Sequence, residues 1–373
     1  MGEVVSITMG QSPSSANYTD NPEDHILVQG NADMKNNRVA PRLWTTQVTK
    51  QAEKGDLILS VRAPVGDIGK TDYDVVLGRG VAAIKGNNFI FQQLGKMKNN
   101  GYWTQYSTGS TFESINSNDI KEAIIYFPDE DEQKKIGAFF KLLDDTIALQ
   151  QRQLENYQKL KKAMLQEIFP ENETKIPKIR FDNFSEKWEQ RKLGQVSDIV
   201  GGGTPSTSIK EYWDGNIDWY SPVEIGERIF LNGSQKKITV LGLQKSSARI
   251  LPIGTVLFTS RAGIGNTAIL AKEACTNQGF QSIIPHKDEL NSYFIFSQTN
   301  KLKRYGEING AGSTFVEVSG KQMAKMPILI PNIQEQHKIG NFFKQIDNTI
   351  ILYQKKMKKM EKLKQACLSK MFI

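Results

Sequence analysis

The residues 128–140, PDEDEQKKIGAFF, place carboxylates just ahead of a lysine, an order that resembles the core of a metal-dependent nuclease. Carboxylate oxygens of that kind hold divalent cations. The same residues also suit the first turns of a helix, in which a proline and acidic side chains are common. One interpretation makes the chain an enzyme, and the other makes this stretch a structural boundary.

Two further motifs resemble parts of enzymes but lack necessary residues. VGDIGKT at 65–71 ends like a phosphate-binding loop, yet Pro64 stands at the first glycine position of the GxxxxGK[ST] pattern. NPED at 21–24 lacks the second proline and the aromatic residue with which an amino-methyltransferase grips a flipped adenine. The three histidines are scattered and are too few for a zinc site of usual spacing.

The chain contains an internal repeat. TGSTFESINSNDIKEAIIYFPDEDEQKKIGAFF from 108 matches AGSTFVEVSGKQMAKMPILIPNIQEQHKIGNFF from 311, and about 25 of roughly 62 positions are identical over the ungapped alignment. Upstream, GDLILSVRAPVG matches GTVLFTSRAGIG, and GEVVSITMGQSPS matches GQVSDIVGGGTPS. We therefore interpret the chain as two copies of one unit, each with a globular part followed by a long helical part.

The repeat tests the apparent catalytic motifs. Asp129 of the first copy is Asn332 in the second, which would remove a metal ligand, and the counterpart of the phosphate-loop motif, IGNTAI, contains Asn266 and no lysine. Asp and Asn are both good helix N-caps, and each precedes a glutamate, Glu132 or Glu335, at capping-box spacing. The pattern therefore favours a helix start over a metal site.

The globular parts are predicted to have a mixed α/β structure, so the fold class is α+β. Short aliphatic runs (DLILSV, AIIYF, TVLFTS and PILIP) are typical of strands, and they are separated by glycine, proline and asparagine. The segments 89–100 and 291–305 have helical character. The predicted boundaries are a globular domain at 1–128, a helix at 129–170, a linker at 171–192, a second globular domain at 193–330 and a second helix at 331–373.

Each helical part carries a heptad-like apolar stripe sustained over several turns, which predicts a coiled coil. The stripe residues expected in the coiled coil or in partner docking are Ile136, Phe139, Phe140, Leu143, Ile147, Ile339, Phe342, Phe343, Ile346 and Ile350. About 38 helical residues would span roughly 57 Å. One such helix cannot bury its stripe alone, so the natural partner of each is the helix of the other copy.

The connection between the copies favours an antiparallel helix pair. Parallel helices would require the linker between Phe169 and Leu193 to return the full helix length, and some 23 residues reach at most about 80 Å. That linker contains Ile176, Phe181 and Trp188, which look anchored rather than stretched. We therefore expect a pseudo-two-fold arrangement with the globular parts at opposite ends of the helix pair.

Composition limits the environment and the partners of the chain. The 373 residues carry a net charge of +8 and a pI near 9.1, which suits a polyanionic partner. Two distant cysteines, Cys275 and Cys367, fit a reducing compartment and exclude a disulfide framework. No apolar run approaches membrane-spanning length, so we expect a cytoplasmic protein without a membrane partner.

Over nearly its whole length, the chain resembles the specificity subunit of a type I restriction-modification enzyme. Two dissimilar globular units each close with GSTF and an aliphatic run, followed by P…EQ.KIG.FF and a long helix. The central KWEQRKLGQV, which opens the second unit, is similar to the usual start of such units.

The resemblance implies a function. Each globular unit would be a target recognition domain that reads one half of a split sequence in double-stranded DNA. The helices would fix the spacing of the half-sites and dock two methyltransferase subunits, which bring S-adenosylmethionine and methylate adenine. Restriction and translocation subunits would join for cleavage. The specificity chain itself would have no catalytic centre and would bind no metal or cofactor.

Candidate DNA-binding residues follow from side-chain chemistry, because base edges are read by side chains that donate or accept hydrogen bonds. The candidates are Asn31, Lys35, Asn36, Arg38, Arg42, Arg62, Arg79 and Ser110 in the first unit, and Lys236, Lys237, Arg249, Arg261, Gln278, Gln281 and Ser313 in the second. Arg62 aligns with Arg261, so this shared pair suits phosphate contacts or loop structure better than base recognition. An ordinary solvated surface role is the alternative for each.

Two questions stay open at the level of sequence. The first unit begins at the equivalent of Leu193 and lacks a counterpart of KIRFDNFSEKWEQRK, so either that extension is absent or the start is truncated, and the closure of its edge is undefined. The alternative function is a coiled-coil scaffold with two ligand-binding heads and no DNA role. A self-sufficient methyltransferase or nuclease is a third class, which would bind cofactor in isolation.

Overall fold

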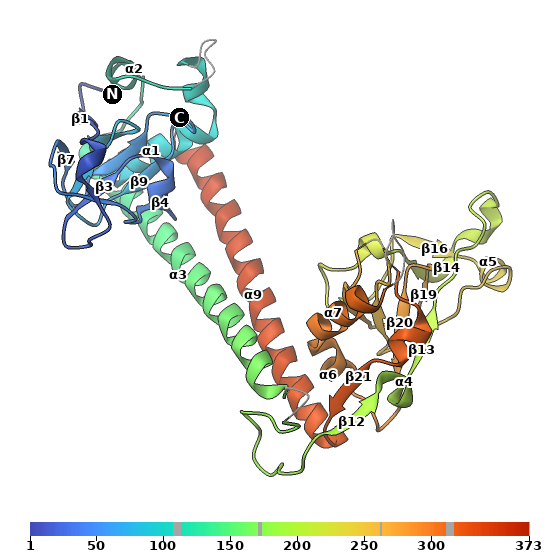
Figure 1. Ribbon diagram of the computed structural model, residues 1–373. Helices are drawn as coiled ribbons and strands as arrows, with labels where there is room; N and C mark the ends of the chain where they lie inside the picture. Colours follow the sequence, from blue (N-terminus) through green and yellow to red (C-terminus); the bar gives the residue numbers. More distant parts are fainter. Residues whose placement is uncertain (107–112, 171–173, 262, 311–316, 373) are drawn as a thin grey trace. The chain divides into compact units, whose positions relative to one another are not determined.

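The computed structural model describes residues 1–106, 113–170, 174–261, 263–310 and 317–372. The chain divides into two compact units. Unit 1 comprises Met1–Gln153 with Tyr353–Ile373, and unit 2 comprises Leu154–Leu352. Figure 1 labels helices and strands of both units. Two long helices, α3 (Glu130–Ile168) and α9 (Ile333–Met371), each contribute one part to each unit. Both are 39 residues long.

Unit 1 contains two sheets, with strand orders β1-β11-β8-β9-β5-β4 and β2-β6-β3-β10-β7. The strands are β1 (Ser6–Met9), β2 (Tyr18–Thr19), β3 (His25–Val28), β4 (Met34–Lys35), β5 (Arg38–Val39), β6 (Trp44–Thr45), β7 (Lys50–Ala52), β8 (Leu57–Ser60), β9 (Ile68–Lys70), β10 (Val75–Leu77) and β11 (Val81–Lys85). Helices α1 (Asn88–Asn99) and α2 (Ser117–Glu122) follow them along the chain. The β8 and β11 strands are buried over most of their length and form the centre of the unit.

Unit 2 contains sheets of order β13-β20-β17-β18-β15, β16-β14-β19 and β12-β21. The strands are β12 (Glu189–Lys192), β13 (Ser197–Gly201), β14 (Trp213–Tyr220), β15 (Phe230–Leu231), β16 (Lys236–Ile238), β17 (Val256–Phe258), β18 (Thr267–Leu270), β19 (Cys275–Thr276), β20 (Gln281–Pro285) and β21 (Pro327–Ile330). The helices are α4 (Leu193–Val196), α5 (Val240–Gln244), α6 (Ser292–Ser297), α7 (Thr299–Asn309) and α8 (Gly320–Ala324).

The sequence repeat is also a structural repeat. The antiparallel series β1, β11, β8, β9 of unit 1 corresponds to β13, β20, β17, β18 of unit 2. Loop hydrogen bonds correspond as well: Val61 N donates to Gly80 O at 2.9 Å, and Ser260 N donates to Gly279 O at 2.8 Å. The mixed α+β character expected for each globular part is therefore present in both.

The two long helices begin with the predicted caps. The Asp129 carboxylate accepts a hydrogen bond from Glu132 N at 2.9 Å, and the Asn332 side chain accepts one from Glu335 N at 2.9 Å. These bonds satisfy amide groups that have no partner within the helix. Residues 128–140 are therefore a helix start, as the comparison of the two copies predicted.

In each unit, aromatic side chains join the two long helices to the globular part. In unit 1, Phe140 of α3 lies 5.6 Å from Phe372, which stacks on Phe89 of α1 at 4.7 Å between ring centroids. In unit 2, Phe343 of α9 lies 5.8 Å from Phe169, which lies 5.4 Å from Phe294 of α6. The helix stripes are thus continuous with the two cores.

Each unit also contains an ion pair between the long helices. Asp144 of α3 binds Lys364 of α9 in unit 1, and Asp347 of α9 binds Lys161 of α3 in unit 2, both at 2.6 Å. These positions are equivalent in the repeat, so the two bonds are copies of one interaction with the roles of the helices exchanged. Asp347 also accepts a hydrogen bond from the buried Tyr293 hydroxyl at 2.8 Å.

Most of the predicted stripe is buried within the chain. Ile136, Phe140, Leu143, Ile339, Phe343 and Ile346 are buried, whereas Ile147, Phe342 and Ile350 are half-buried and Phe139 is exposed. The buried members serve intramolecular packing, so they are not available to dock a second protein.

The linker between α3 and β12, which belongs to unit 2, is anchored by a buried ion pair. Arg180 donates two hydrogen bonds to the Glu335 carboxylate, both at 2.8 Å, and the glutamate side chain is fully buried. Trp188 lies 6.0 Å from Phe169 and 5.7 Å from Phe294. After the tryptophan, β12 pairs with β21 in antiparallel register.

The predicted strand in the run AIIYF is wrong. Residues 123–127 have no strand assignment, although the equivalent PILI forms β21. The reason is pairing: β21 has β12 as its neighbour, and no strand of the described part of unit 1 takes the place of β12. A strand without a ladder partner has no backbone hydrogen bonds to define it.

Replacing Arg180 by alanine should destabilise unit 2 by about 3 kcal/mol, because a fully buried carboxylate loses its cation. Denaturant unfolding followed by Trp fluorescence measures this. The matched control is Glu132→Ala, at the exposed position of unit 1 that corresponds to Glu335. An Arg180→Ala variant as stable as the control would contradict the anchoring role.

Candidate nucleic-acid interface

An open pocket of about 400 Å³ in unit 1 brings together three of the predicted DNA-binding residues, Asn31, Arg62 and Arg79. Its other polar side chains are Ser12, Tyr18, Gln29 and Ser60. The pocket therefore collects guanidinium, amide and hydroxyl groups from segments that lie far apart in the sequence.

The turn between β10 and β11 positions Arg79. Gly78 N donates to Val28 O at 2.7 Å, which holds the turn against the end of β3. A Cβ atom at Gly80 would stand 2.1 Å from the carbonyl oxygen of Gln29, so only glycine fits there. Arg79 N donates to the Ser12 hydroxyl at 3.0 Å, which brings the segment after β1 to the pocket.

Arg62 lies just after β8, where the chain leaves the sheet. The Ser60 hydroxyl donates to Arg62 O at 2.9 Å, and Arg62 forms an antiparallel bridge with Ser114. Both Arg62 and Arg79 are exposed, and in the described part of the chain neither side chain forms an ion pair. Two unneutralised guanidinium groups at one pocket favour an anionic ligand.

Arg42 has a different role. The buried Asp33 carboxylate accepts hydrogen bonds from Gln29 N at 2.7 Å and from Gly30 N at 3.2 Å, and Arg42 pairs with its second oxygen at 2.6 Å. Arg42 thus neutralises the carboxylate that shapes the Gln29 turn. The Gln29 side chain donates to Tyr18 at 2.7 Å, which orients its amide in the pocket.

Unit 2 repeats this arrangement with other side chains. Arg261 corresponds to Arg62, and its Nε lies 3.6 Å from the position of a Cβ at Gly279. Gln278 occupies the position of Arg79, and the Thr204 hydroxyl donates a hydrogen bond to the Gln278 side chain. The equivalent Ser12 hydroxyl accepts a hydrogen bond from Arg79 N. Arg261 is 3.9 Å from Glu317, a longer separation than in a close ion pair.

Each unit therefore has an arginine at the equivalent position, Arg62 or Arg261, and the units differ in the neighbouring side chains. Asn31, Gln29 and Arg79 in unit 1 present donors and acceptors that suit base edges, and Gln278 in unit 2 presents an amide instead of a guanidinium. A shared cation with different neighbours can hold the same backbone while distinguishing two sequences.

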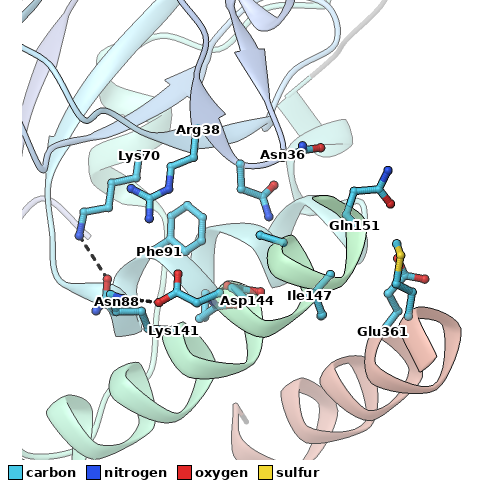
Figure 2. A pocket seen from close by; sticks show the side chains of 15 residues that line it. Asn36, Arg38, Lys70, Asn88, Phe91, Lys141, Asp144, Ile147, Gln151 and Glu361 are labelled. Atoms are coloured by element: carbon cyan, nitrogen blue, oxygen red, sulfur yellow. Dashed lines mark hydrogen bonds and ion pairs between the residues drawn. The ribbon is translucent and has the colours of Figure 1, made fainter. Parts of the chain in front are cut away.

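Asn36 and Arg38 lie in another pocket of unit 1, of about 370 Å³, shown in Figure 2. The β4–β5 turn presents Asn36, which has a left-handed φ of 51°. Asp144 and Asp145 of α3 and Glu361 of α9 also line the pocket, together with Lys70 and Lys141. Arg38 pairs with Asp72 at 2.6 Å, and Asp144 and Asp145 pair with Lys364 and Lys141, so most of the charges around this pocket are neutralised. These two candidates do not join the Arg62 group.

The remaining candidates are dispersed. Lys35 is exposed on β4. In unit 2, Lys236 lies over the Trp213 ring, Lys237 is 3.5 Å from Asp218, and Arg249 is exposed. Gln281 starts β20 and faces Gly320. Ser110 and Ser313 lie outside the described residues. DNA contact by these residues stays a prediction.

Sequence reasoning missed Ser12, Tyr18, Gln29 and Thr204. A signal for two of them exists, because Ser12 and Thr204 each precede a proline in the matched segments GQSP and GGTP. Tyr18 and Gln29 carry no comparable signal, because tertiary contacts alone bring them to the pocket.

The described residues contain no group of three or more His, Cys, Asp or Glu side chains that could hold a metal ion. Burial raises the pKa of the Cys275 thiol to about 11, so it is protonated at neutral pH. In the part of the chain that is described, no helix combines the length and apolar composition that crossing a bilayer requires.

Comparison with known proteins agrees with this geometry. The chain is 36% identical over 194 residues to the type I restriction enzyme MjaIX specificity subunit of Methanocaldococcus jannaschii, covering 51% of this chain and 44% of that protein. It is 29% identical over 167 residues to the EcoR124I/EcoR124II specificity subunit of Escherichia coli, covering 43% and 41%. The matches span less than half the length of these relatives.

Solved structures share the fold. The S subunit of a type I restriction-modification system from M. genitalium matches with a TM-score of 0.69 at 14% identity, covering 99% of this chain and 94% of that one. A chain from a study of complex assembly and conformational transition in the type I R-M system matches with a TM-score of 0.52 at 19% identity, covering 99% and 95%. The family model described as the type I restriction modification DNA specificity domain matches residues 1–159 and 185–362. The chain belongs to this family of type I restriction-modification DNA specificity proteins and carries its domain twice.

Proposed function

We propose that this chain is the DNA-binding specificity subunit of a type I restriction-modification complex and that it reads a bipartite target in double-stranded DNA. The observation that carries the proposal is the repeated turn, in which Arg62 and Arg261 are equivalent while Arg79 and Gln278 differ. Two identical recognition surfaces related by a two-fold axis would specify a palindrome. Two different surfaces suit an asymmetric pair of half-sites.

The long helices would set the spacing between the half-sites. The pairs Asp144–Lys364 and Lys161–Asp347 exchange the roles of the helices, which is the pattern of an antiparallel, pseudo-two-fold coiled coil. The ring contacts Phe140–Phe372 and Phe169–Phe343 have the same exchanged pattern. A helix pair of this kind is stiff enough to act as a ruler.

Exposed leucines on the helices support two equivalent docking surfaces. Leu149 and Leu352 are equivalent in the repeat and are 53% and 49% exposed, and Leu160 and Leu363 form a second equivalent pair. Two copies of an apolar surface suit two methyltransferase subunits, one for each half of the chain.

The chemistry would then belong to the partners. The methyltransferase subunits would bind S-adenosylmethionine and modify adenine, and restriction and translocation subunits would join for cleavage, all in the cytoplasm. In this proposal, the chain directs the partner subunits to their DNA target and has no catalytic centre of its own. The cations and amides in the pocket of Arg62 and Arg79 suit a binding surface, which supports this division.

The DNA role predicts a steep salt dependence. Affinity of the chain for duplex DNA, measured by fluorescence anisotropy with methyltransferase subunits present, should fall linearly on a log–log plot against salt concentration, with a slope of about −0.9 per phosphate contacted. A scaffold whose heads bind another kind of ligand predicts no duplex binding at any salt concentration, and that result would overturn the proposal.

Substitutions of Arg79, Gln278 and Arg62 should separate base contacts from phosphate contacts. Arg79→Ala should relax discrimination in one half-site only, and Gln278→Ala in the other, each by about 1–3 kcal/mol. Arg62→Ala should weaken binding to all sequences and reduce the salt slope by about one contact. Competition binding with half-site variants of the target measures both. An Arg79→Ala variant with unchanged preferences would argue against base contact.

Charge placed on the exposed leucines should block subunit docking. Leu149→Lys should remove one methyltransferase subunit from the complex and Leu352→Lys the other, because each puts a charge into an apolar contact. Native mass spectrometry gives the stoichiometry, and Lys159→Glu, at another position of α3, is the control for altered charge alone. Loss of both subunits on a single substitution would contradict two independent surfaces.

A further inference from the structure

Unit 2 presents an exposed valine close to Arg261. Val223 is 90% exposed, more than any other large apolar side chain in the part of the chain that the structure describes. It lies in the 3₁₀ turn Pro222–Glu224, which follows β14. A Cβ atom at Gly279 would stand 2.9 Å from Cγ of Pro222 and 3.6 Å from Nε of Arg261. The valine therefore follows directly on a residue that packs beside Arg261.

The strand that leads to this turn has a counterpart in unit 1. Asn277 N donates to Tyr220 O at 3.0 Å at the end of β14, and Gly78 N donates to Val28 O at 2.7 Å at the end of β3. Both strands pair in parallel with the strand that precedes the donor, β19 or β10. After the strand, each unit forms a short 3₁₀ turn. The two turns are therefore equivalent in position.

In unit 1, the equivalent turn forms part of the recognition pocket. It comprises Asn31–Asp33, and Asn31 lines the pocket with Arg62 and Arg79. Its third residue, Asp33, accepts a hydrogen bond from Gly30 N at 3.2 Å, three positions earlier. This turn therefore belongs to the surface on which the two arginines lie.

The third residue of the unit 2 turn forms the same type of bond, which aligns the two turns residue by residue. The Glu224 carboxylate accepts a hydrogen bond from Ser221 N at 3.0 Å. Val223 then corresponds to Ala32, and Pro222 corresponds to Asn31. Unit 2 thus presents a larger apolar side chain on the surface where unit 1 presents an amide and a single methyl group.

The turn holds the valine in one place. The second oxygen of the Glu224 carboxylate accepts a hydrogen bond from Gln235 N at 2.8 Å, which ties the turn to the segment ahead of β16. Ile225, two residues after Val223, is only 6% exposed and packs in a core of unit 2. A β-branched side chain has few rotamers, so little entropy is lost when it makes a contact. Val223 is thus a rigid apolar contact point that the core does not use.

We propose that Val223 contacts the C5-methyl group of a thymine in the half-site that unit 2 reads, so that it is a specificity-determining residue. The thymine methyl is the apolar group that base pairs present in the major groove, and small apolar side chains recognise it. The neighbouring Arg261 favours an anionic ligand, so DNA is a better occupant than an apolar protein surface. This inference rests on the proposed function and adds to it one base and one chemical group.

Deoxyuridine tests the contact, because it differs from thymidine only in lacking the C5-methyl group and forms the same base pair. Each thymine of the specific target positions is replaced in turn, and binding to the complex of the chain with methyltransferase subunits is measured by fluorescence anisotropy. One replacement should weaken binding about fourfold, the loss expected for one buried methyl group. Val223→Ala should weaken binding of the thymine duplex about fourfold or more, and the same replacement should then cost nothing further.

Ile253→Ala is the matched control. Ile253 is 66% exposed and precedes β17, whereas Arg261 follows that strand, so the substitution removes an exposed apolar group at the other end of β17. Ile253→Ala should bind thymine and deoxyuridine duplexes as the unmodified chain does. An equal loss in this variant would show a general effect of surface apolarity and would overturn the inference.

The outcomes separate this inference from the proposed function. Sequence-specific binding in which no thymine replacement is coupled to Val223→Ala would overturn the inference and leave the proposed function standing. A complex that binds no duplex would overturn both. A Val223→Ala complex that lacks a methyltransferase subunit in native mass spectrometry would assign the valine to subunit docking and would overturn the inference alone.

Discussion

The structure depends on one constraint, which is that two long amphipathic helices must each bury an apolar stripe that neither can bury alone. α3 and α9 solve it inside one chain, through Phe140 and Phe372 in unit 1 and through Phe169 and Phe343 in unit 2. Because those rings continue into Phe89 and Phe294 of the globular parts, each half of the helix pair is tied to one sheet system. Helix packing and domain packing are therefore one continuous core within each unit.

A repeated framework with local differences connects this core to function. In both units a main-chain hydrogen bond holds the turn: Val61 N donates to Gly80 O, and the equivalent Ser260 N donates to Gly279 O. The residue just ahead of this glycine is Arg79 in unit 1 and Gln278 in unit 2. The side chain at this position can therefore differ between the units while the main-chain frame is kept.

Much of this was predictable from sequence, for a physical reason. Repetition exposed the helix caps at Asp129 and Asn332, the apolar stripe and the α+β units, since these follow from local pattern and periodicity. The site was only partly predictable: Arg62 and Arg79 were identified, but Tyr18 and Gln29 reach the pocket through tertiary contacts that no spacing reveals. Asn36 and Arg38 come from the same polar stretch as Asn31, yet they line a different pocket, beside α3 and α9.

The strand expected in AIIYF shows the limit of local pattern most clearly. Its residues resemble those of β21, and only the neighbour differs, so pairing rather than propensity decides the structure there. The Glu132 and Glu335 positions differ for the same reason. One glutamate is exposed and the other is fully buried beneath an arginine that the sequence supplies only once.

The proposed function requires that two different surfaces on one chain direct modification to two different half-sites. Methylome sequencing of a host that carries this chain with its methyltransferase measures this. We expect methylated adenines in a motif of two unlike specific halves separated by a fixed number of unspecified bases. A continuous motif, or no methylation that depends on the chain, would contradict it.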